Sequence, residues 1–222
     1  MTLLAFENNV FINCPLDPSY VDILRPILFC ILALGFEPRI ALERADSAET
    51  RIHKILELIL ESKFGIHDLS RLKASKKGEY FRLNMPFELG IDYGCRAFKG
   101  EPWNSKKLLI LEAERYRFQA AISDLSGSDI GVHRNEPVSA STEVRNWLAQ
   151  GLGNIVPGPA AVWARFTDFM ADNYDALTAR GYSTTDIASQ PISELIGCMR
   201  DWLTANPHVL DTTSGVRSGE RP

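Results

Sequence analysis

The chain has 222 residues, of which 45% are hydrophobic and 23% charged, with 15 Gly and 12 Pro. This composition is close to that of average globular proteins, and it excludes collagen, a continuous coiled coil and wholesale disorder. The formal net charge of −4 argues against a protein that binds duplex nucleic acid, because phosphate contacts require a net basic surface.

The cysteines and the apolar segments indicate the cellular compartment of the protein. Cys14, Cys30, Cys95 and Cys198 include no C-x-x-C pair, so we expect neither a disulfide framework nor a metal site. The first nine residues carry no Lys or Arg and do not read as a secretory signal. The longest apolar stretch, 27–36, is shorter than the ~20 residues of a membrane span. We therefore expect a soluble, cytoplasmic protein without membrane or nucleic-acid partners.

The first forty residues predict a strand, a helix and a second strand. Residues 10–12 are β-branched or aromatic and stop at Pro15, as a buried strand would. Asp17-Pro18 then resembles a helix N-cap, and apolar residues at helical spacing continue to Gly35, a typical stop. Residues 36–42 complete this unit as the second strand.

The pattern repeats in the next seventy residues. Ser47 or Thr50 caps a predicted helix with an apolar face over 52–60, and 64–69 form the third strand. A polar, basic loop over 70–83 precedes a helix over 86–96 and a clear strand over 107–111. Strands alternating with helices predict a parallel sheet covered on both faces.

Beyond residue 112 the pattern weakens but predicts an edge strand over 129–132 and a helix over 138–148. We therefore expect an α/β, flavodoxin-like parallel sheet of about five strands within 1–152. A Gly- and Pro-rich linker then leads to a C-terminal helical extension over 153–206, and 207–222 have the composition of a disordered tail. The two apolar stripes of the extension indicate packing onto the core; a dimer or partner surface is the other interpretation.

Polar side chains follow the predicted strands at their carboxyl ends, where ligands bind in such sheets. They would rim one cleft: Asn13, Asp17, Arg39, Glu43, Asp68, Ser70, Glu112 and Glu114. Asp68 could instead cap a loop, Asn13 could form a turn, and His67 reads as a half-buried structural histidine. The loop with Arg71, Lys73, Lys76 and Lys77 is either a phosphate contact or a solvated run, and Tyr80 and Phe81 either stack on a base or pack at the core edge.

Glu88 is the candidate for chemistry. It is placed in the first turn of the predicted helix, where the helix dipole would keep it ionised. An ionised, fixed carboxylate can attack an anomeric carbon or stabilise an oxocarbenium-like centre. The alternative is that Glu88 only complements the dipole. Glycine-rich phosphate loops, serine elbows and zinc-protease motifs do not occur in the sequence.

Three short runs carry a family resemblance: residues 11–15 (FINCP), 66–71 (IHDLSR) and 84–90 (NMPFELG). In order and spacing they resemble uncharacterised bacterial TIR-like proteins associated with defence loci, over residues 9–150. The run from Phe87 to Gly90 also looks like that of nucleoside deoxyribosyltransferases, in which the matching glutamate is the nucleophile. Arg82 and Asn84 stand in the stretch where those transferases carry an acidic residue that contacts the base.

The resemblance implies an enzyme that cleaves the N-glycosidic bond of NAD or a related nucleotide, with NAD as substrate and no cofactor, and with a role in antiphage defence. Glu88 and Asp68 would be catalytic. Substrate contacts would come from Asn13, Asp17, Arg39, Ser70, Arg71, Asn84 and Phe87. The chain would form a homo-oligomer or bind a partner through its C-terminal helices. Alternatives are a non-catalytic nucleotide sensor or scaffold, and a deoxyribosyltransferase.

Overall fold

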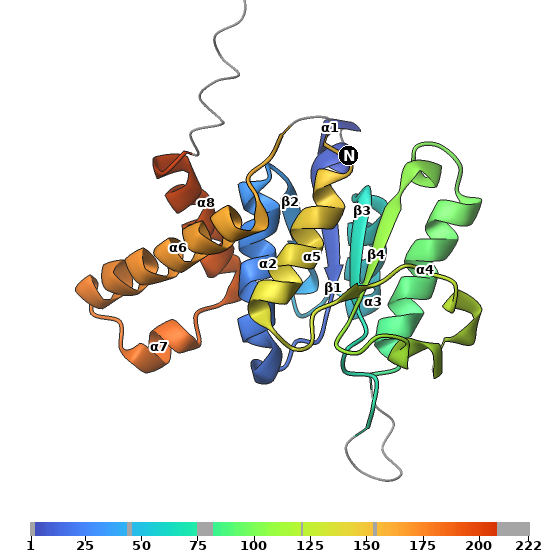
Figure 1. Ribbon diagram of the computed structural model, residues 1–222, viewed down its shortest axis with the longest axis horizontal. Coiled ribbons are helices and arrows are strands. Elements are labelled where there is room, and N and C mark those ends of the chain that lie inside the picture. Colours follow the sequence, from blue (N-terminus) through green and yellow to red (C-terminus); the bar gives the residue numbers. More distant parts are fainter. Residues whose placement is uncertain (1–2, 44–45, 75–81, 121, 153–154, 208–222) are drawn as a thin grey trace, which may run out of the picture.

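The computed structural model describes residues 3–43, 46–74, 82–120, 122–152 and 155–207. Its centre is a sheet of five parallel strands in the order β2-β1-β3-β4-β5 (Figure 1). The strands are β1 (Asn9–Asn13), β2 (Glu37–Ile40), β3 (Phe64–Asp68), β4 (Lys107–Glu112) and β5 (Gly131–Val132). This is the flavodoxin-like order, and it confirms the predicted fold class.

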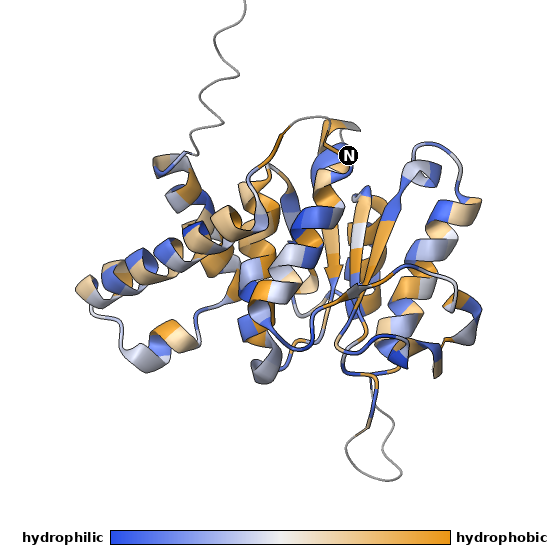
Figure 2. Ribbon diagram, viewed as in Figure 1, coloured by the Kyte–Doolittle hydropathy of each residue, from blue (hydrophilic) through white to orange (hydrophobic). Residues whose placement is uncertain are grey.

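Helices cover both faces of the sheet. α2 (Val21–Ala33) and α5 (Pro137–Ala149) lie on one face, and α3 (Arg51–Leu60) and α4 (Asn84–Phe98) on the other. The alternation of β1 shows how: Val10 and Ile12 join the cluster under α2, whereas Phe11 between them packs on α3. With both faces buried, the central strands are mostly apolar between polar end residues, as the hydropathy colours of Figure 2 show.

The C-terminal helices pack onto α2. The group consists of α6 (Pro159–Ala179), the short α7 (Thr184–Ala188) and α8 (Ile192–Ala205), at the left of Figure 1. The ring of Phe29 in α2 lies 5.7 Å from Phe166, 5.6 Å from Phe169 and 5.9 Å from Trp202. The two predicted apolar stripes thus share one core with α2 and α5.

Several boundaries differ from the sequence predictions. Asp17-Pro18 begins a short 3-10 turn, and α2 starts only at Val21. α4 starts at Asn84, two residues before the predicted start, because a proline in the first turn needs no hydrogen-bond partner for its nitrogen. α1 (Leu3–Asn8) and α7 were not predicted, although α7 has a capping box from Ser183 and Asp186.

Some predictions fall outside the described residues: those for Lys76, Lys77, Tyr80, Phe81 and the tail over 208–222. Within the described ranges, every helix is too short or too polar to cross a membrane.

β3 and α4 pack closely at Gly65, where there is no room for a side chain. A Cβ at this position would lie 2.4 Å from Asp92 Oδ2 and 2.9 Å from Leu108 Cδ2. Asp92 cannot yield because His67 holds the same oxygen. We expect Gly65→Ala to lower the free energy of unfolding by about 1–3 kcal/mol in urea titrations. Gly127→Ala, whose Cβ would meet nothing within 4 Å, is the control; equal stability of the two variants would contradict the packing described.

Candidate functional site

The candidate site lies at the carboxyl ends of β1 and β3. From β1 the chain passes to β2 through α2 on one face, and from β3 it passes to β4 through α4 on the other face. The loops after these adjacent strands therefore diverge, and such a switch point is where open α/β sheets bind ligands. Asn13 ends β1 and Asp68 ends β3, so the structure brings these two predicted residues to this point.

Glu88 projects from the inner side of α4 and is 3% exposed. Asn84 Nδ2 donates to its Oε1 at 3.3 Å, and Arg51 Nη2, on a half-exposed side chain at the start of α3, lies 3.6 Å from the same oxygen. Burial raises the pKa of Glu88, and this effect outweighs the opposing influence of Asn84 and Arg51. The predicted first-turn position is wrong because α4 begins four residues before Glu88. The expectation that the dipole keeps it ionised is corrected with it.

A chain of buried polar groups fixes α4 against the sheet. Asn13 Nδ2 donates to the Met85 carbonyl at 3.0 Å and lies 3.1 Å from His67 Nδ1. Because an amide nitrogen can only donate, Nδ1 accepts and the neutral ring carries its proton on Nε2, 3.1 Å from Asp92 Oδ2. Asp92 Oδ1 in turn lies 3.2 Å from Lys106 Nζ. His67 is a structural histidine, as one interpretation expected, but it is fully buried rather than half-buried.

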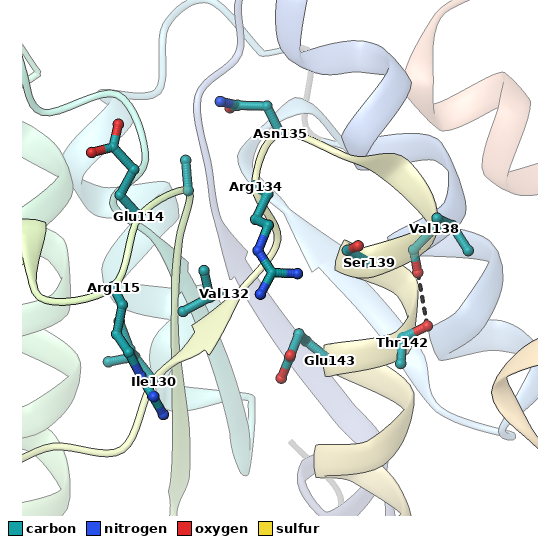
Figure 3. A pocket seen from close by; sticks show the side chains of 11 residues that line it. Glu114, Arg115, Ile130, Val132, Arg134, Asn135, Val138, Ser139, Thr142 and Glu143 are labelled. Atoms are coloured by element: carbon teal, nitrogen blue, oxygen red, sulfur yellow. Dashed lines mark hydrogen bonds between the residues drawn. The ribbon is translucent and has the colours of Figure 1, made fainter.

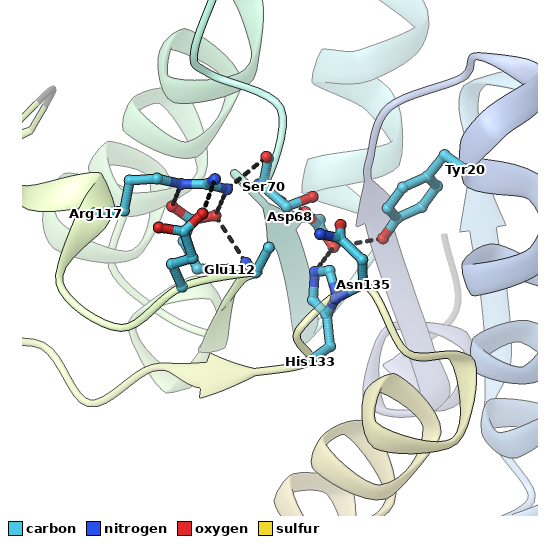
Figure 4. A network of polar contacts seen from close by, with 9 residues as sticks. Tyr20, Asp68, Ser70, Glu112, Arg117, His133 and Asn135 are labelled. Carbon is cyan, nitrogen blue, oxygen red and sulfur yellow. Dashed lines mark hydrogen bonds and ion pairs between the residues drawn. The ribbon is translucent and has the colours of Figure 1, made fainter.

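Asp68 is the centre of a second buried cluster (Figure 4). Tyr20 donates to its Oδ2 at 2.5 Å, the Ser70 amide donates to Oδ1 at 2.8 Å, and His133 Nε2 lies 3.1 Å from Oδ2. The backbone N–H of Asn135 donates to His133 Nδ1 at 3.0 Å. The neutral ring therefore carries its proton on Nε2, which faces Asp68. Burial and the carboxylate of Asp68 raise the pKa of Tyr20.

The bond from the Ser70 backbone N–H means that Asp68 caps the loop after β3. This is the alternative interpretation of Asp68 that the sequence offered. Its side chain is fully buried, and the catalytic assignment stays a prediction. Tyr20 and His133 were missed by the sequence reasoning. Their partner lies 48 and 65 positions away in the sequence, and no local pattern signals such contacts.

The acidic residues expected on the rim are mostly neutralised. Arg117 donates to both oxygens of buried Glu112, at 2.8 and 2.5 Å, and lies 2.9 Å from Glu114. The same guanidinium donates to the Ser70 carbonyl at 2.6 Å and so fixes the loop after β3. Glu112 and Glu114 therefore shape the site rather than add net charge to it.

The remaining predicted contacts lie apart from Glu88 or on its periphery. Asp17 pairs with Arg82 at 2.5 Å. Arg39 pairs with Glu43 at 2.7 Å and with Glu61 at 2.9 Å, which satisfies its charge beside β2. Phe87, although adjacent to Glu88 in sequence, is 61% exposed. Substrate contacts by these residues stay predictions.

Among the buried polar atoms near this edge that have no hydrogen-bond partner in the described residues, three lie on predicted substrate contacts. They are Asn13 Oδ1, Ser70 Oγ and Arg71 Nε. Buried polar atoms in folded proteins are nearly always paired, so each of these atoms is a candidate contact for a polar ligand or for water. All three belong to residues that the sequence assigned to substrate contacts.

A cavity of about 890 Å³ lies at the other end of this edge, between the loop after β4, strand β5 and α5 (Figure 3). Arg115 and Arg134 line it together with Glu114 and Glu143. Arg134 and Asn135 have positive φ angles of 52° and 59°, a conformation uncommon for residues other than glycine. Glu88 is not among the lining residues, and the sequence did not predict this cavity.

The described ranges contain no cluster of three or more His, Cys, Asp or Glu side chains that could hold a metal ion. In comparisons with known proteins, the chain matches no protein-family model, no curated protein sequence and no solved structure.

The raised pKa of Glu88 predicts a pH dependence of stability. The folded chain binds the Glu88 proton more tightly than the unfolded chain, in which the carboxyl group has its ordinary pKa of 4.5. Stability contributed by this site is therefore present at low pH and lost as the pH rises through the raised pKa. We expect wild type to lose stability relative to Glu88→Gln as the pH rises above the ordinary pKa of 4.5, in urea titrations at a series of pH values.

Glu194→Gln, at an exposed position in α8, is the control for this experiment. The stability difference between wild type and this control variant should stay nearly constant over the same range. A pH-independent difference for Glu88→Gln as well would contradict the assignment.

Proposed function

We propose that the protein cleaves the N-glycosidic bond of NAD or a related nucleotide at the carboxyl ends of β1 and β3. The observation that carries this proposal is the set of unpaired buried atoms on Asn13, Ser70 and Arg71. A ribose offers hydroxyl groups that can donate to Asn13 Oδ1 and pair with Ser70 Oγ. A phosphate offers an oxygen that can accept from Arg71 Nε.

Glu88 supplies the charge that the reaction requires. As the bond between the anomeric carbon and the base nitrogen breaks, its electron pair leaves with the base and positive charge develops on the ribose. The base of NAD is a cation before cleavage and leaves as a neutral molecule, so no acid is needed to protonate it. A buried carboxylate that faces the ribose stabilises the developing charge without reorganisation. Water then adds to the anomeric carbon and gives up a proton to the solvent.

The ion pair with Arg51 fits this role. The Arg51 side chain is 51% exposed, whereas that of Glu88 is 4% exposed, so the guanidinium can swing into solvent while the carboxylate stays in place. A substrate cation would then replace Arg51 beside Glu88. Asn84, which donates to Glu88, keeps the carboxylate oriented during this exchange.

The main alternative is a non-catalytic nucleotide sensor, and the same ion pair is the observation that favours it, because Arg51 already satisfies Glu88. Transfer of the ribosyl group to a second base, as in deoxyribosyltransferases, uses the same first step and differs only in the acceptor. The resemblance to TIR-like proteins extends the proposal to antiphage defence and to assembly with other copies or a partner.

The test measures release of nicotinamide from NAD, and of free base from deoxynucleosides, by wild type and Glu88→Gln. We expect the substitution to lower turnover about 100-fold or more, because it removes the charge that faces the ribose, while ADP-ribose still binds in calorimetry. Glu194→Gln should leave turnover unchanged.

Binding of ADP-ribose without turnover by wild type would support the sensor instead. Turnover by Glu88→Gln at the wild-type rate would overturn the catalytic assignment. Analysis of products with a second free base present separates transfer from hydrolysis.

A further inference from the structure

The outer face of α4 is apolar and exposed. Leu83 is 64% exposed, Phe87 61%, Tyr93 44% and Phe98 89%. Gly90 and Ala97 also lie on this face and are exposed, and Gly94 is partly exposed. We call these seven residues the α4 face. A solvent-facing helix surface normally carries charged residues, and this one carries none.

Two of the three charged residues of α4 point elsewhere, and the third borders the α4 face at Tyr93. Glu88 and Asp92 are buried on its inner side, and Arg96 stacks on the Tyr93 ring, 4.8 Å from its centre. At the two ends, Arg82 pairs with Asp17 and Lys99 lies 4.5 Å from the centre of the Trp103 ring. The cations that flank the α4 face are thus held by partners within the chain.

The two glycines of this face have no role in the packing of the single chain. A Cβ on Gly90 would meet nothing within 4 Å, and one on Gly94 would meet only the Phe98 ring, at 3.8 Å. Neither glycine has the positive φ that would require one, and glycine within a helix is less stable than alanine. Glycines four residues apart do, however, allow a second helix to approach closely.

The order of residues along the α4 face is complementary to itself. The midpoint between Gly90 and Ile91 is equally far from Phe87 and Gly94, and equally far from Leu83 and Phe98. In an antiparallel pair of α4 helices about a two-fold axis at this midpoint, each Phe87 ring lies over the partner's Gly94. Each Leu83 likewise meets the partner's Phe98. Such pairing of one patch with itself is the interface type of two-fold dimers.

The exposed area is sufficient for such a dimer. A buried aromatic side chain removes about 150–250 Å² from water. Scaled by their exposed fractions, Phe87, Tyr93 and Phe98 together with Leu83 offer roughly 500 Å² per copy. Two copies would then bury about 1,000 Å², the lower bound of specific interfaces.

We propose that the α4 face binds the α4 face of a second copy of this chain, antiparallel, about a two-fold axis between Gly90 and Ile91. The inference is independent of the proposed catalytic function. It assigns self-association to the helix that carries Glu88, and not to the C-terminal helices, whose apolar residues pack on α2.

The test is sedimentation equilibrium of the full chain over a wide concentration range. We expect a monomer–dimer equilibrium whose Kd rises at least about tenfold in Gly90→Leu, because the new side chain fills the space between the helices. Gly197→Leu is the matched control, since Gly197 is also within a helix and a Cβ there would likewise meet nothing within 4 Å. A second pair is Phe98→Glu and Ile155→Glu, with Ile155 90% exposed.

Dimerisation lost in Gly90→Leu and Phe98→Glu but kept in both controls, with unchanged circular dichroism, supports the proposal. A chain that stays monomeric at all concentrations overturns it, as does a dimer with equal Kd in all four variants. Binding of the monomer to lipid vesicles through Phe98 would also overturn it.

Discussion

Four buried polar side chains, joined end to end, determine where α4 lies on the sheet. Asn13 from β1, His67 from β3, Asp92 from α4 and Lys106 before β4 form this chain. The buried ammonium group of Lys106 has three partners, because besides Asp92 it donates to the Ile59 carbonyl at 2.8 Å and to the Ser62 carbonyl. Burying such charges without partners would be prohibitive. The chain therefore permits only one position of α4, and with it one position of Glu88.

Near this helix, at the carboxyl ends of the strands, the buried carboxylates have hydrogen-bond or ion-pair partners. Asp68 is held by Tyr20, the Ser70 amide and His133, and Glu112 is held by Arg117. Asn13, Ser70 and Arg71 nevertheless each have a buried polar atom without a hydrogen-bond partner among the residues that the structure describes. A site that satisfies its charges and leaves a few neutral or cationic donors and acceptors free suits a polar ligand with hydroxyl and phosphate groups better than a metal ion.

α4 reverses the usual distribution of a surface helix. Its inner side holds the carboxylates of Glu88 and Asp92, and its outer side holds exposed rings and glycines. One helix thus turns its carboxylates toward the sheet and the candidate site, and its apolar face toward solvent. Association through the outer face would place two candidate sites near a common axis, with their fixed carboxylates on the sides of the helices that face away from it.

The sequence by itself determined the sheet, because local periodicity and turn residues specify each strand and helix without knowledge of their neighbours. It predicted all five strands to within two residues at each end, and Thr50, one of two predicted caps, does precede α3. The first residues of α2 and α4 were predicted wrongly, because the local sequence allows each helix to start at more than one residue. The sequence also selected Asn13, Ser70 and Arg71 as polar positions after strand ends, and Glu88 as a carboxylate near the start of a helix.

Only the tertiary structure decided how these residues are paired. The burial of Glu88 beside Arg51, the His133 contact to Asp68 and the exposure of Phe87 each depend on segments that are distant in the sequence. Periodicity shows that a residue lies on an apolar face, but not whether a neighbouring element covers that face. For this reason the C-terminal stripes proved to be core, whereas the outer face of α4 proved to be open.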